Sequence, residues 1–142
     1  MMKLLTSLVL VLAACTGSSE DASSPACQAA TSHSDFAWIQ TNVFDTSCVL
    51  SGCHMGAAAN AGHLNLADGM SYNELVDEPS QVQEGWKRVV PGDPSSSYLM
   101  VALGHESGPM PPDGYMPLSS PALCSEKIDA IERWISAGAL QQ

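Results

Sequence analysis

After Cys15 the chain has few large apolar side chains for its length. Val, Ile, Leu, Met, Phe, Trp and Tyr make up 33 of the remaining 127 residues. Gly and Pro interrupt the same stretch repeatedly, as in Pro91-Gly92-Asp93-Pro94 and Pro111-Pro112-Asp113-Gly114. Small domains are stabilised mainly by buried apolar surface and are marginal when that surface is short. We therefore expect something besides these side chains to help fill the core.

The charge balance excludes one class of partner. The chain has 15 Asp and Glu residues against 5 Lys and Arg residues, a formal net charge of −10. Nucleic-acid binding needs clustered cationic side chains that displace counterions from phosphates. We therefore expect no nucleic-acid partner. The acidity is consistent with plain solubility, or with steering toward basic patches on partner proteins.

The first fifteen residues predict export. Lys3 gives a positive start, an apolar run follows, and the stretch is too short to span a bilayer. Its ending, Leu12-Ala13-Ala14-Cys15, resembles a bacterial lipobox, which implies cleavage after residue 14 and lipidation of Cys15. Thr16 favours the outer membrane. The alternative is an ordinary secretory signal with a chance Cys. Residues 15–33, rich in Ser, Ala and acidic side chains, predict a flexible tether, and residues 34–142 the folded domain.

Four stretches of the domain predict helices. Apolar residues recur at helical spacing over 35–47, behind the capping residue Asp35. A second stripe runs from Ser125, as its cap, to a stop at Gly138. Shorter helices are expected over 71–76, from the capping-box pattern of Ser71 and Glu74, and over 96–103. Alternating strand patterns are missing from the sequence, so we expect a small all-α domain with long Pro- and Gly-rich loops.

The segment Cys48-Val49-Leu50-Ser51-Gly52-Cys53-His54 carries the strongest chemical signal. Covalent attachment of c-type haem uses C-x-x-C-H, in which two thiols bond the haem and the adjacent His binds iron. Here the spacer has four residues, and Gly52 permits the bulge that this requires. Two alternatives stay open: a Cys48–Cys53 disulfide with His54 as a bystander, and a zinc or copper site.

A haem iron held by His54 has a sixth position that another side chain can fill. Met110 lies in a stretch stiffened by Pro109, Pro111 and Pro112, which suits a weak thioether ligand. Met116, which precedes Pro117, is the rival. His105 and His63 are further candidates, and an open site is the remaining possibility.

The order of these parts resembles the c-type cytochrome domains of exported bacterial proteins, in particular a single-haem, class I-like group. The resemblance covers Asp35 to Leu140 and includes Cys53-His54, Val89-Val90-Pro91-Gly92-Asp93-Pro94 and Met110-Pro111-Pro112. It implies a cytochrome c-like fold of three to five short helices around one covalent haem c, held by Cys48, Cys53 and His54. It also favours Met110 as the sixth ligand, and suggests that the 89–94 loop supplies a carbonyl to the other nitrogen of His54.

The same resemblance implies a disulfide. In class I-like folds the terminal helices cross, and Cys27 and Cys124 each precede one of them, so the resemblance implies a Cys27–Cys124 bridge in an oxidising compartment. The alternative is two free or separately paired thiols.

We therefore expect a membrane-tethered electron carrier that exchanges single electrons with redox partner proteins, rather than an enzyme. Two other classes stay open. One is a haem protein with an open or labile sixth site, peroxidase-like or gas-binding. The other is a haem-free surface lipoprotein stabilised by disulfides.

Overall fold

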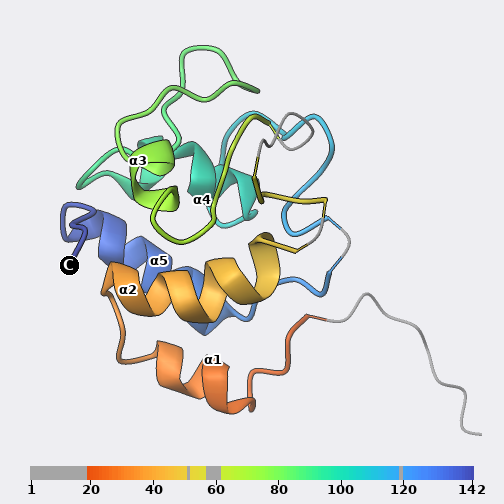
Figure 1. Ribbon diagram of the computed structural model, residues 1–142, viewed down its shortest axis with the longest axis vertical. Coiled ribbons are helices and arrows are strands. Elements are labelled where there is room, and N and C mark those ends of the chain that lie inside the picture. The colour runs from red at the N-terminus through yellow and green to blue at the C-terminus, as the bar shows by residue number, and fades with distance from the viewer. Residues whose placement is uncertain (1–18, 51, 57–61, 119) are drawn as a thin grey trace, which may run out of the picture.

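The computed structural model describes residues 19–50, 52–56, 62–118 and 120–142. Short helices separated by long loops make up this part of the chain, and its only β-structure is four isolated bridges (Figure 1). The all-α class expected from the sequence is confirmed. The elements are α1 (Pro25–Ala30), α2 (Phe36–Ile39), η1 (Gln40–Cys48), α3 (Ser71–Leu75), η2 (Pro94–Ser96), α4 (Tyr98–Ala102) and α5 (Ser125–Ser136).

The helix expected over 35–47 is present, but it widens along its length. Asp35 caps α2 by accepting a hydrogen bond from the Trp38 backbone N–H at 2.9 Å. From Gln40 the helix continues as the π-helical segment η1. Within it, the side chains of Asn42 and Thr46 donate to the carbonyls four residues earlier, at 3.0 and 2.8 Å. Such side-chain donors compete with backbone N–H groups for those carbonyls, which favours a wider turn.

The last helix, α5, closes the core against α2 and η1. Its buried face carries Ile131, Trp134 and Ile135, and the Trp134 ring lies 5.0 Å from the ring of Phe36. The cap position belongs to Cys124, not to Ser125 as expected. The buried apolar cluster comprises Phe36, Ile39, Val43, Phe44, Val49, Leu66, Leu75, Val89, Met100, Leu123, Ile131, Trp134, Ile135 and Ala139.

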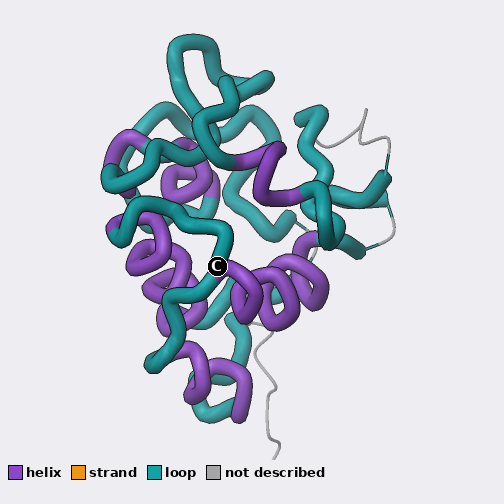
Figure 2. Tube along the Cα trace, turned by 60° about the vertical axis from the view of Figure 1, so that its left-hand side comes forward, coloured by secondary structure: helices purple, strands orange, loops and turns teal. Residues whose placement is uncertain are grey.

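The two short internal helices lie among loops, which make up most of the half of the molecule that carries α3 and α4 (Figure 2). Ser71 begins α3 without capping it; its hydroxyl instead donates to the buried Gln40 side chain of η1. α4 is shorter than the expected 96–103 helix, because Pro94–Ser96 forms the separate 3₁₀ turn η2. Asp93 caps that turn through the Ser96 backbone N–H at 3.1 Å.

Residues 19–33 differ from the flexible tether that we expected. Helix α1 lies in this stretch and packs against α5, to which the Cys27–Cys124 disulfide joins it. Ser24 caps α1, and the Glu20 backbone N–H donates to the Ala122 carbonyl at 2.7 Å. The folded part therefore begins no later than Ser19 instead of at residue 34. The bridge implied by the resemblance is confirmed.

The expected signal segment and lipidated Cys15 lie outside the described residues. Within the described ranges, none of the helices has the length and apolar character needed to cross a membrane.

Replacing both Cys27 and Cys124 by Ser should lower the free energy of unfolding by about 2–5 kcal/mol, because the bridge closes a long loop in the unfolded chain. The two residues are 97 positions apart. Urea denaturation of the purified protein measures the change, and reduced wild type should match the double variant. Equal midpoints for oxidised wild type and the double variant would contradict the prediction.

Candidate cofactor cavity

An apolar cavity of about 330 Å³ lies between η1, α4 and the loops that carry Leu64, Val82 and Pro112. This volume falls in the usual range of roughly 300–1,000 Å³ for small-molecule and cofactor sites. Its apolar lining comprises Val43, Phe44, Leu64, Leu66, Leu75, Val82, Leu99, Ala102, Leu103, Leu118, Leu123 and Ile131. A more open depression of about 590 Å³ adjoins Gly104 and Tyr115, but neither thiol nor His54 borders it.

Cys48, Cys53 and His54 all lie on the wall of the apolar cavity. Cys48 is the last residue of η1, and the His54 backbone N–H donates to its carbonyl at 3.1 Å. Gly52 has φ of +83°, the conformation expected for the longer spacer. The structure thus places Cys48, Cys53 and His54 around one cavity. Neither thiol is in a disulfide, so the Cys48–Cys53 bridge considered above is not formed.

The imidazole of His54 is oriented by residues 64–66. Its Nδ1 lies 3.2 Å from the Leu64 carbonyl oxygen, and the Leu66 backbone N–H donates to the His54 carbonyl at 2.9 Å. The suggestion that the 89–94 loop supplies this carbonyl is therefore wrong. When Nδ1 carries the proton that it donates to Leu64, Nε2 is the nitrogen whose lone pair can bind a metal.

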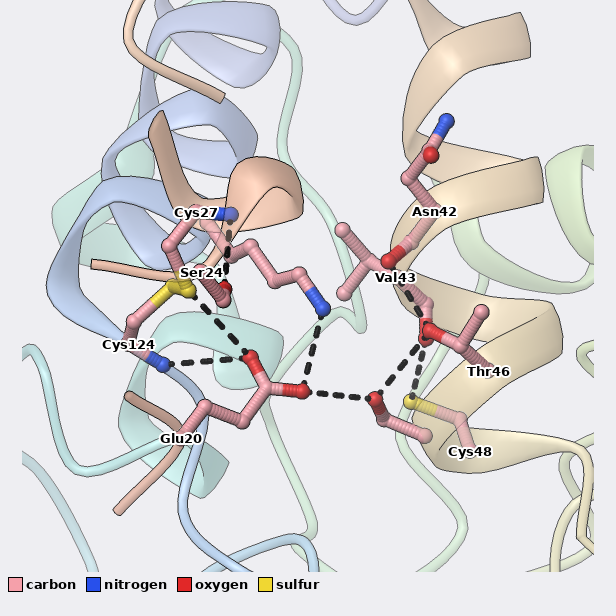
Figure 3. Close-up of polar contacts among 10 residues, drawn as sticks. Glu20, Ser24, Cys27, Asn42, Val43, Thr46, Cys48 and Cys124 are labelled. Carbon is pink, nitrogen blue, oxygen red and sulfur yellow. Dashed lines mark hydrogen bonds and ion pairs between the residues drawn. A yellow bond between two sulfur atoms is a disulfide. The ribbon is translucent and has the colours of Figure 1, made fainter. Parts of the chain in front are cut away.

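An ion pair between Lys127 and Glu20 joins α5 to the N-terminal segment, beside the end of η1 (Figure 3). Lys127 is 3% exposed, and its Nζ lies 3.0 Å from Glu20 Oε1. The same carboxylate oxygen accepts from the Ser47 hydroxyl at 3.4 Å, next to Cys48. Burial raises the pKa of the Cys48 thiol to about 12, although the Lys127 charge acts in the opposite direction.

The two methionine candidates occupy different environments. Met110 is 63% exposed and does not line the cavity, whereas Met116 is half-buried and does. The backbone N–H of Met116 donates to the Ala102 carbonyl at 2.8 Å, which ties it to the end of α4. His63 and His105 are exposed and contribute nothing to the cavity wall formed by the described residues.

The described residues of the wall suit a largely apolar group that carries a metal ion. The lining is apolar, two thiols and one imidazole share the wall, and Tyr98 adds a hydroxyl that has no hydrogen-bond partner among the described residues. A buried hydroxyl left without a partner costs free energy, which a polar group on a ligand can recover. The described wall also carries Asp113 and Met116, a carboxylate and a thioether that could complete a zinc or copper site, so that alternative stays open.

Four residues near the site were not identified from the sequence: Glu20, Arg88, Tyr98 and Lys127. The sequence offered one indication that Arg88 is buried: it is one of only five Lys and Arg residues and directly precedes the apolar pair Val89-Val90. The sequence offered no such indication for Glu20, because its neighbours do not distinguish it from the other acidic residues.

No protein family, curated protein or solved structure matches this chain.

In protein produced without haem attachment, an alkylating reagent at about pH 8 should modify Cys53 much faster than Cys48, because the thiolate is the reactive form. Cys53 is exposed, and burial raises the pKa of Cys48 to about 12. Peptide mass spectrometry measures the two rates. Denatured protein should lose the difference, and equal rates in the folded protein would contradict the burial of Cys48.

Proposed function

We propose that this protein is a c-type cytochrome that carries single electrons. The observation that carries the proposal is the presence of Cys48, Cys53 and His54 on the wall of one apolar cavity. A disulfide or a chance arrangement would not require an apolar space of cofactor size next to the two thiols. The expected fold, helices around a haem with long loops packed on it, is consistent with this arrangement.

In the proposed mechanism, Cys48 and Cys53 would hold a haem through two thioether bonds, each formed by addition of an S–H across one vinyl group with nothing released. His54 would hold the iron through Nε2, with its Nδ1–H donating to the Leu64 carbonyl. The bound haem supplies the one-electron Fe(II)/Fe(III) couple. The apolar lining excludes water, which keeps the couple in a low-dielectric environment.

We propose that the sixth ligand comes from the loop between α4 and α5. The resemblance favours Met110, which is exposed, whereas the cavity wall favours Met116. If neither thioether binds, the site is open, which is the peroxidase-like or gas-binding alternative. A Met ligand together with His54 would raise the reduction potential relative to two His ligands.

The proposed setting is the surface of a bacterial membrane, through a lipid on Cys15, with the outer membrane favoured. The net charge of −10 favours encounters with basic patches on redox partner proteins and makes their association depend on ionic strength.

Wild type produced with the cytochrome c maturation machinery should retain haem on a denaturing gel, and the pyridine haemochrome spectrum should report two thioethers. Cys48→Ala and Cys53→Ala should each leave one thioether, and His54→Ala should prevent stable loading. His63→Ala is the matched control, because His63 is exposed and lies off the cavity wall. A haem-free wild type would overturn the proposal and favour a haem-free lipoprotein.

Met110→Ala and Met116→Ala test which of the two methionines binds the iron. Exactly one of the single variants should lose the red charge-transfer band of sulfur-ligated Fe(III) and bind CO readily when reduced. Loss in Met116→Ala supports the ligand at the cavity wall, and loss in Met110→Ala means that the loop turns this residue inward on loading. Retention of the band in the double variant would exclude both.

A further inference from the structure

Arg88 is a buried cation at the cavity wall that binds two separate segments. The residue is 8% exposed. Its Nη1 donates to the Glu74 carbonyl at 2.7 Å and to Glu74 Oε2 at 3.0 Å. Its Nη2 donates to the His63 carbonyl at 2.9 Å and to the Gly62 carbonyl at 3.4 Å. Burial of a guanidinium is costly unless it is paired in this way, and the planar fork of Arg can reach both segments at once.

The segment that Arg88 holds is the one that orients His54. Gly62, His63 and Leu64 present three successive carbonyls: the first two accept from Arg88, and the third lies 3.2 Å from Nδ1 of His54. His63 has φ of +52°, a conformation that side chains other than Gly seldom adopt. Because this backbone is unfavourable by itself, the bonds from Arg88 help to keep the Leu64 carbonyl where His54 meets it.

We propose that Arg88 is a positioning residue for His54: it fixes the 62–64 carbonyls and so keeps the Leu64 oxygen on Nδ1. The inference rests on the proposed haem ligation by His54. A carbonyl on the far nitrogen of a metal-bound His fixes its tautomer and raises its basicity. A more basic His stabilises Fe(III), so weakening this bond raises the reduction potential.

The test uses the haem-loaded full chain and Arg88→Lys, which keeps the charge but replaces the fork by a single ammonium. Arg88→Lys should shift the reduction potential to more positive values and speed exchange of the His54 Nδ1 proton, followed by NMR in the reduced state, by about tenfold. Lys87→Gln is the matched control, because Lys87 is the neighbouring cation and pairs with Asp77 at the surface. It should leave both quantities unchanged.

Glu74→Gln distinguishes an effect of Arg88 on the position of His54 from an effect on the stability of the whole fold. It removes the charge partner of Arg88 on the α3 side but leaves the bonds to His63 and Gly62 possible. Glu74→Gln should lower the unfolding temperature with little change in the exchange of the His54 Nδ1 proton. Haem-loaded Arg88→Lys with wild-type potential and wild-type Nδ1 exchange would overturn the inference while leaving the proposed function intact. A wild type without covalent haem would overturn both.

Discussion

The packing of α5 against the α2–η1 helix is the interaction on which the rest of the structure depends. The aromatic contact between Phe36 and Trp134, with Ile131 and Ile135 on the same face, uses much of the limited apolar material of the chain. What remains is distributed over short helices and loops, which surround a space instead of filling it. The cavity lies between this helix pair and the short helices and loops that supply the rest of the buried cluster.

That arrangement explains why Cys48, Cys53 and His54 lie on the cavity wall. η1 continues α2, which packs on α5, and its own residues reach the cavity, with Cys48 at its end. The chain then turns back, so that the His54 N–H meets the Cys48 carbonyl. The place of Cys48 on the cavity wall thus follows from the packing of the helix pair. The loop between η1 and α3 supplies Leu64, whose carbonyl oxygen lies on Nδ1 of His54.

Features with a local physical cause were predictable from the sequence. Asp35 caps its helix, the apolar stripe of α5 is buried, and Gly52 has positive φ. Features that depend on distant partners were not. Helix α1 has no apolar stripe and is held by Cys124, and backbone carbonyls such as that of Leu64 carry no sequence signal. The environment of Met116 depends on the path of a loop, which the spacing of Pro residues does not determine.

The attachment of Glu20 to the folded body changes how far the domain could move from a membrane. A lipid on Cys15 would be joined to Ser19 by four Cα–Cα steps, a span of at most about 14 Å. The nineteen-residue tether expected from the sequence would allow several times that distance. With Glu20 held by Lys127 and Ala122, a lipidated form would be confined to a thin layer beside the bilayer. Its search for partners would then be two-dimensional, governed by diffusion along the membrane surface and by the side of the domain that faces away from it.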